Sequence, residues 1–221
     1  MAYTKTILCL ACSRKPDGRC VAGKEYSTQG ITDWIRPVTP GATTSINNAQ
    51  RKYPDGYYAV ALDYIQIEFT GSQQGVFQAE NQLINQPSTW KLIGKADKSV
   101  LANIVDSPIS LWSNTCPDSD NGINDRVSGR LLTQPCESLY LIRVPQINVH
   151  VEIVDERRKL RGEFMYNNTK YKLKITDVKF EKLFENHAEG VFATNIDYLT
   201  VSLGEIFAAD NYAYKLIAAV F

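Results

Sequence analysis

The sequence carries no net charge, because its 221 residues include 24 Lys and Arg and 24 Asp and Glu. A balanced chain has no general attraction to nucleic acid or to a membrane surface, so a charged ligand must be held by a local site. No apolar run approaches the ~20 residues that span a bilayer, and residues 1–5 lead into a short apolar run without a signal-peptide pattern. We therefore expect a cytoplasmic protein that does not contact a membrane.

Metal and disulfide patterns are also missing. Five cysteines are an odd number, which favours free thiols in a reducing compartment. Cys9 and Cys12 have C-x-x-C spacing, but residues three apart on a continuous strand face opposite sides. No second pair with that spacing follows, and the only histidines are His150 and His187. A tetrahedral zinc site needs four placed ligands, so we expect no metal and no cofactor.

The sequence contains no nucleophile elbow, phosphate-binding loop or zinc-protease motif, and therefore identifies no catalytic residue. Asp33, Asp125 and His150 keep open one alternative, an enzyme that acts on a nucleotide or nucleic acid. Salt bridges are the commoner role for such aspartates, and a lone histidine on a strand is more often structural. We favour a protein without catalytic activity.

What the sequence does have is alternation of polar and apolar residues with a period of two. Ile65, Ile67 and Phe69 alternate with polar residues, which predicts a strand with one buried face over 57–69. Asn167-Asn168 between two such runs predicts a hairpin. Many short strands favour an all-β fold with short helices. The other expected strands are 4–11, 139–144, 148–154, 161–166, 170–175, 198–203 and 212–221, and the expected helices are 98–105 and 178–186.

The middle of the chain changes character. Residues 113–136 are polar and rich in turn-forming residues, particularly over 113–122, which is typical of a loop or a boundary. We take them as a linker between a first barrel, 1–112, and a second barrel, 137–221. No internal repeat relates the two halves, so this division rests on the number of strands.

The most informative segment is 13–23, Ser-Arg-Lys-Pro-Asp-Gly-Arg-Cys-Val-Ala-Gly. Three cations surround a Pro-Asp-Gly turn, and glycine allows close approach of a ligand to the backbone. Loop amides and arginines together can hold a phosphate. The alternative is a surface hairpin whose cations are simply solvated. With one cation from the next strand, the candidate phosphate-binding residues are Ser13, Arg14, Lys15, Arg19, Gly23 and Arg36.

Trp34 and Arg36 are two residues apart on the next extended segment, so both are expected on one face of a strand. A base can stack between a Trp ring and a guanidinium group, which makes Trp34 the candidate stacking residue, with one of the twelve tyrosines as the alternative. The alternative is a core Trp34 with Arg36 reaching toward solvent at the edge.

These segments resemble the N-terminal signature of the dual OB-containing domain family. The resemblance implies two tandem OB-type barrels encoded in bacterial and phage-related neighbourhoods, often with defence or conflict systems. It supplies no catalytic residues. It spans nearly the whole chain and rests on residues 7–15, 18–23, 34–38, 201–205 and 214–220, with weaker matches at 62–65, 80–81 and 111–112.

We therefore predict a non-catalytic module that recognises single-stranded nucleic acid or a nucleotide, as a sensor or accessory subunit in a bacterial or phage defence-type system. A protein–protein adaptor that docks a partner encoded nearby is the alternative. It suits residues 57–140, which hold five Lys and Arg against nine Asp and Glu.

Overall fold

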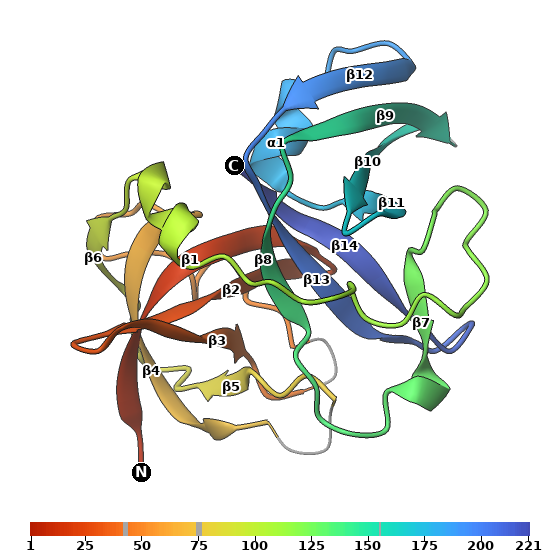
Figure 1. Cartoon of the computed structure of the whole chain (residues 1–221). Helices are drawn as coiled ribbons and strands as arrows, with labels where there is room; N and C mark the ends of the chain where they lie inside the picture. Colours follow the sequence, from red (N-terminus) through yellow and green to blue (C-terminus); the bar gives the residue numbers. More distant parts are fainter. Residues whose placement is uncertain (42–43, 74–76, 155) are drawn as a thin grey trace. The chain divides into compact units, whose positions relative to one another are not determined.

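The computed structural model describes residues 1–41, 44–73, 77–154 and 156–221. It divides into two compact units, Met1–Ile104 and Val105–Phe221. In the described residues, strands make up nearly all of the regular structure (Figure 1). The expected all-β class with short helices is confirmed. The division follows Ile104, ahead of the boundary at residue 112 that the sequence suggested.

The first unit is a closed barrel. Its sheet has the order β1-β2-β3-β5-β4-β6, and β1 also pairs with β4, which closes five strands into a ring. Neighbours are antiparallel except β3 and β5, which are parallel. The elements are β1 (Tyr3–Lys15), β2 (Gly18–Ser27), β3 (Gly30–Val38), β4 (Asp63–Ser72), β5 (Asn81–Ile84), β6 (Lys91–Lys95) and the 3-10 helix η1 (Lys98–Asn103).

The core of this barrel follows the predicted alternation, since Ile65, Ile67 and Phe69 are all buried in one cluster. The strand expected over 57–69 begins only at Asp63. Leu62 has a φ of 72° and its backbone N–H donates to the carbonyl of Cys9 at 2.8 Å. That left-handed residue turns the chain into β4, so residues 57–62 belong to the preceding loop.

A β-bulge in β1 changes the expected orientation of two cysteines. The pairing of β1 with β2 shifts register between Cys9 and Ala11. Such a bulge inserts one extra residue, so the alternation of faces changes phase across it. Cys9 therefore lies in the core cluster and Cys12 packs against the same cluster. The expectation that the two cysteines face opposite sides was wrong for this reason.

The second unit is built on a sheet of order β12-β9-β10-β11-β14-β13-β8, with β7 paired to β14. β11 and β14 run parallel. A separate hydrophobic cluster, which includes Phe164, Tyr171 and Ile217, fills this unit. The elements are β7 (Arg126–Ser128), the 3-10 helix η2 (Gly129–Leu131), β8 (Leu139–Arg143), β9 (Gln146–Val154), β10 (Arg157–Tyr166), β11 (Thr169–Ile175), α1 (Val178–Leu183), β12 (Gly190–Asn195), β13 (Tyr198–Phe207) and β14 (Tyr212–Val220).

The predicted Asn-Asn hairpin is confirmed. β10 ends at Tyr166 and β11 begins at Thr169. Asn167 and Asn168 have φ values of 45° and 60°, the left-handed conformation that two-residue hairpin turns require and asparagine tolerates.

Residues 113–136, which the sequence suggested as a linker, are tied to the sheet of the second unit. β7 pairs with β14, and the backbone of Ile123 exchanges hydrogen bonds with Lys172. Lys215, which is 1% exposed, donates from Nζ to the carbonyl of Ser113 at 2.9 Å and to Oδ1 of Asn114 at 2.6 Å. A buried ammonium group needs such acceptors, so this lysine fastens the start of the segment.

Candidate nucleic-acid interface

The basic hairpin of the sequence is the connection between β1 and β2. Lys15 pairs with Gly18, so Pro16 and Asp17 form a two-residue turn, with Asp17 at a φ of 61°. Arg14 pairs directly with Arg19 across the two strands. Residues directly opposite in an antiparallel pair share a face, and like charges there repel each other. The fold therefore concentrates positive charge at this end of the barrel.

The two arginines lie on the inner side of the sheet. The preceding pair on the same face is Cys12 and Val21, and both residues contact the core. Lys15 has the opposite orientation, because successive residues of a strand alternate between faces. Its Nζ donates to Oγ1 of Thr44. Ser13 shares the face of Lys15 and is buried. Arg14 is exposed and Arg19 is partly exposed, so solvent reaches both arginines.

The two glycines of residues 13–23, Gly18 and Gly23, allow neighbouring backbone segments to pack closely. A Cβ placed on Gly23 would lie 2.1 Å from the carbonyl oxygen of Leu8 in β1. A Cβ on Gly18 would lie 2.4 Å from the carbonyl oxygen of Ile46. Both glycines therefore allow backbone to approach neighbouring backbone within the barrel, and these contacts account for the two glycines without a ligand.

Trp34 and Arg36 share a face, as their spacing predicts, but it is the face opposite Arg14 and Arg19. Ile35, between them, is buried in the core and pairs with Gly23. The Arg36 side chain is 5% exposed, and its Nη2 lies 3.1 Å from Oε1 of Glu80, which is 6% exposed. Its charge is therefore matched inside the molecule. The structure brings Arg14 and Arg19 together and places Lys15, Trp34 and Arg36 on the other side of the sheet.

Trp34 is partly exposed and is not a core residue. The ammonium group of Lys24 lies 5.6 Å from the centre of its ring. The same Nζ donates to the carbonyl of Ile104 at 2.8 Å, and Lys24 is buried. On this outer face, the rings of Tyr26 and Tyr64 lie 4.7 Å apart. The outer face thus offers aromatic rings, but its lysine is used in a contact within the unit.

The loop between β3 and β4 runs beside the two arginines. Ile46 forms an isolated bridge with Arg19, with both backbone hydrogen bonds at 2.9 Å. Farther along, the carbonyl of Ala59 accepts from Sγ of Cys12 at 3.4 Å. Because Arg14 follows Cys12 on the same face, this loop passes the end of the barrel where the arginines lie.

That loop presents two tyrosines. Tyr57 is 74% exposed and Tyr58 is 42% exposed. The guanidinium of Arg51 lies 4.5 Å from the centre of the Tyr58 ring and is itself held by Oδ1 of Asn48 at 3.0 and 2.8 Å. Sequence reasoning missed this site because it assigned both tyrosines to a strand. The Pro-Asp-Gly run at 54–56 was the signal for a loop there.

The model of the dual OB-containing domain matches residues 5–220 of the chain. The chain belongs to the dual OB-containing domain family. The tandem OB-like architecture expected from the sequence is thereby confirmed. OB barrels commonly bind nucleic acid, with the β1–β2 loop beside the binding face. No curated protein and no solved structure matches this chain.

In the first OB barrel, the β1–β2 loop is the turn at Pro16 and Asp17. The arginine pair therefore lies at a position where OB folds recognise oligonucleotides. The β3–β4 loop that carries the tyrosines is tied to it by the bridge between Ile46 and Arg19. The combination of exposed guanidinium groups with exposed rings is the composition of a single-strand site. We call Arg14, Arg19, Arg51, Tyr57 and Tyr58 the barrel-end site.

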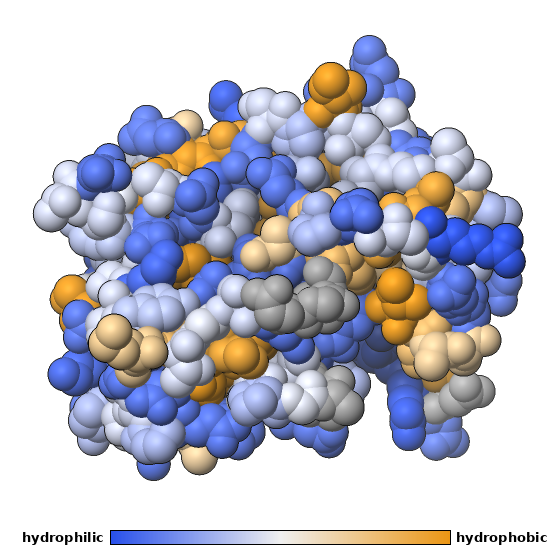
Figure 2. Space-filling view, turned by 90° about the horizontal axis from the view of Figure 1, so that it is seen from below, coloured by the Kyte–Doolittle hydropathy of each residue, from blue (hydrophilic) through white to orange (hydrophobic). Residues whose placement is uncertain are grey.

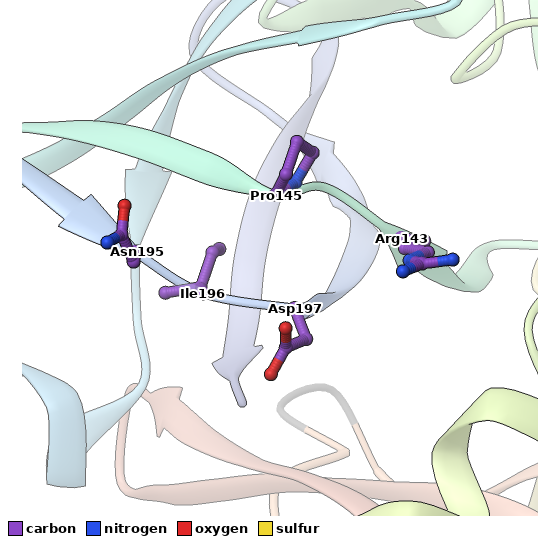
Figure 3. Close-up of a pocket in the computed structure, with 5 residues that line it drawn as sticks. All are labelled: Arg143, Pro145, Asn195, Ile196 and Asp197. Atoms are coloured by element: carbon purple, nitrogen blue, oxygen red, sulfur yellow. The ribbon is translucent and has the colours of Figure 1, made fainter.

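One cavity of about 200 Å³ lies in the second OB unit, lined by Arg143, Pro145 and residues 195–197. In Figure 3 the polar ends of Asn195, Asp197 and Arg143 point in different directions. A small-molecule site usually brings a few polar groups together around its ligand. This cavity therefore gives less support for a ligand than the barrel-end site does.

Cys9 and Asp125, two of the residues considered for metal binding or catalysis, are buried. Among the described residues, no group of three or more His, Cys, Asp and Glu side chains could hold a metal ion. Burial raises the pKa of the Cys9 thiol well above its usual value. Asp125 is buried and accepts from the backbone N–H of Ser119 at 3.0 Å. Asp33 lies exposed in the other OB unit.

The molecular surface gives no sign of a membrane site on the side drawn in Figure 2. Hydrophilic residues predominate there, and hydrophobic residues form small, separate groups. Larger contiguous apolar areas mark protein or membrane contacts. None of the helices in the described residues has the length and apolar composition that crossing a membrane requires.

Proposed function

We propose that this dual OB protein recognises single-stranded nucleic acid or a nucleotide and catalyses no reaction on it. The observation that carries the proposal is the direct pairing of Arg14 with Arg19 at the exposed end of the β1–β2 hairpin. Two guanidinium groups on one face repel each other. A phosphate group between them would relieve that repulsion through charge-assisted hydrogen bonds.

The loop tyrosines supply the second part of the interface. A base can stack on an exposed ring, and such stacking is worth about 1–3 kcal/mol per base. Tyr58 suits this role because Arg51 supports one side of its ring at 4.5 Å, which reduces the freedom lost on binding. In this proposal Arg14 and Arg19 contact phosphate, Tyr58 stacks, and Arg51 is a positioning residue.

The family resemblance also supports a proposal about the setting in which the protein acts. We propose that the protein acts in the cytoplasm as a sensor or accessory subunit of a bacterial or phage defence-type system. Purification from the host, nuclease digestion and mass spectrometry of any bound material would separate RNA, DNA and small nucleotides. A partner protein recovered without nucleic acid would favour the adaptor alternative.

Binding of a labelled oligothymidylate, followed by fluorescence anisotropy over a series of salt concentrations, tests the site. For single strands each lost phosphate contact lowers the slope of log affinity against log salt by about 0.7. We expect Arg14→Gln combined with Arg19→Gln to weaken binding and to lower that slope by about 1.4. The matched control removes two exposed lysines of the same unit, Lys91→Gln with Lys98→Gln, and should leave both quantities near wild type.

The stacking role has its own pair of variants. Tyr58→Ala should weaken binding by about 5- to 150-fold, which corresponds to the loss of one stacked base, whereas Tyr58→Phe should bind like the wild type. Wild-type affinity in both the double arginine variant and Tyr58→Ala would refute the barrel-end site.

A further inference from the structure

The two ends of the sheet in the second unit differ in how they are covered. β8 lies at one end, where the backbone N–H of Asp106 donates to the carbonyl of Leu141 and Oδ2 of Asp106 accepts from the N–H of Leu141, both at 2.7 Å. β12 lies at the other end, beside β9 (Figure 1). In the described part of the chain, no backbone hydrogen bond reaches the second edge of β12. This edge is therefore open to another strand.

β12 also lacks the features that usually keep a strand edge from pairing. Natural edge strands carry lysine or proline, or are interrupted by a β-bulge. The outermost strand of the first unit, β6, follows this rule, since it begins at Lys91, ends at Lys95 and shifts register against β4. The sequence of β12 is Gly-Val-Phe-Ala-Thr-Asn, without a charge or a proline, and its six residues pair with β9 without a register shift. This composition is typical of a strand that is paired on both sides.

Hydrogen bonds at the two ends of β12 show which of its backbone groups point outward. The carbonyl of Pro145 accepts from the N–H of Ile196 at 3.4 Å, and the N–H of Ile153 donates to Oε1 of Glu189 at 2.8 Å. Odd-numbered residues of β9 therefore point toward β12, where the register gives them even-numbered partners. Hydrogen-bonded and non-hydrogen-bonded positions alternate along an antiparallel pair. The residues of β12 whose N–H and C=O groups point away from β9 are Val191, Ala193 and Asn195.

A second copy of β12 has the geometry to satisfy these groups. All three residues are exposed, and Val191 is 61% exposed. If an identical strand lies antiparallel across a two-fold axis at Ala193, then Ala193 lies opposite its own copy and Val191 lies opposite Asn195 of the partner subunit. Residues at hydrogen-bonded positions exchange both N–H···O bonds. Every outward backbone group of the strand would then have a partner.

We propose that the protein forms a symmetric dimer in which the open edges of β12 from two copies pair antiparallel, centred on Ala193. A two-fold contact brings the same surface patch together twice, so a charge near the axis would meet its own copy. β12 carries no charge and avoids this repulsion. The partner is therefore a second copy, whose uncharged strand matches the edge in length and register.

The inner face of β12 supports the same register. Phe192 packs against the core cluster, and the ring of His187 lies 5.0 Å from its ring. In the proposed dimer, Phe192 lies opposite Thr194 of the partner subunit. Aromatic residues directly opposite β-branched ones stabilise antiparallel pairs. The barrel-end site belongs to the first unit, and the dimer does not depend on it.

Sedimentation velocity of the full chain, from nanomolar to high micromolar concentrations, measures the dimer. Ala193→Lys places two ammonium groups directly opposite each other at the axis and should raise the dissociation constant about 5-fold or more. The side chain of residue 193 is exposed in one copy, so the variant should still fold. Ala208→Lys, at an exposed alanine in the turn between β13 and β14, is the matched control and should dimerise like the wild type.

A charge exchange tests the position of the axis. Ala193→Asp alone should weaken the dimer as Ala193→Lys does. A mixture of the two variants should form a heterodimer more tightly than either variant forms a homodimer, because opposite charges then face each other. This result requires residue 193 to lie opposite itself.

Hydrogen exchange reports on the edge directly. The amide protons of Val191, Ala193 and Asn195 should exchange more slowly at concentrations where the dimer forms, and unchanged exchange would overturn the inference. A wild type that stays monomeric at every concentration would overturn it as well, as would a dimer that Ala193→Lys and Ala208→Lys affect equally. If these amides became protected in a monomer only after addition of a host extract, a strand of another protein would occupy the edge and the inference would be wrong.

Discussion

Replacement of Arg36 by methionine tests whether this arginine is part of the barrel or part of a ligand site. Its side chain is 5% exposed and pairs at 3.1 Å with Glu80, which is 6% exposed. Removal of one partner leaves the other charge buried and unpaired, which typically costs about 3–5 kcal/mol. With a denaturant slope of about 1–3 kcal/mol per molar urea, the unfolding midpoint should fall by about 1 M or more.

Urea unfolding followed by tryptophan fluorescence measures this effect. Of the three tryptophans, Trp112 lies in the second unit, so a Trp112→Phe background leaves Trp34 and Trp90 to report on the first unit alone. A double-mutant cycle with Glu80→Gln should give a coupling energy of about 0.5–3 kcal/mol, since the two side chains are in contact.

The outcome that would refute the reasoning is specific. If Arg36→Met unfolds at the wild-type midpoint but loses oligonucleotide affinity, then Arg36 acts on a ligand and the buried pair contributes little to stability. We expect the opposite, with reduced stability and wild-type affinity measured at urea-free conditions where the variant is folded.

Two further predictions concern stability. Gly23→Ala should destabilise the first unit by about 1–3 kcal/mol, because its Cβ would lie 2.1 Å from the carbonyl oxygen of Leu8; Gly94→Ala, whose nearest neighbour is 3.9 Å away, is the control in urea unfolding. Burial lowers the pKa of Lys215 from 10.5 to about 8. The unfolded state therefore binds more protons between these values, and the stability of wild type relative to Lys215→Met should rise by up to about 3 kcal/mol from pH 8 to pH 10.5. A pH-independent difference between the two proteins would contradict that assignment.

Local patterns predicted much of the fold. The Asn167-Asn168 turn, the buried alternation of Ile65, Ile67 and Phe69, and the all-β class were read from residue spacing alone. These features depend on neighbours in sequence, where side-chain direction and φ preference act directly. The number of strands suggested two barrels, and the family resemblance supplied their OB architecture.

The side of the sheet on which each candidate residue lies depends on pairing between distant segments, and it was harder to predict. The bulge between Cys9 and Ala11 changes which residues of β1 face the core. The alternation of polar and apolar residues along one strand predicts neither the position of this bulge nor the register in which β2 pairs with β1. The hypothesis of one cluster before residue 40 therefore could not anticipate that Arg14 and Arg36 lie on opposite sides of the sheet.

The number of Lys and Arg residues in a segment also overestimates its capacity to bind an anion, because some of these residues form ion pairs or hydrogen bonds within the protein. Residues 1–56 hold eight Lys and Arg. Lys5 pairs with Glu25 at 2.8 Å and Lys24 donates to the carbonyl of Ile104. Arg36 pairs with Glu80, and Arg51 supports the ring of Tyr58.

What separates Arg14 and Arg19 from these cations is their register. They face each other directly across a hairpin, where like charges repel each other. Directly opposed cations therefore indicate an anion-binding surface more specifically than net charge or local composition does.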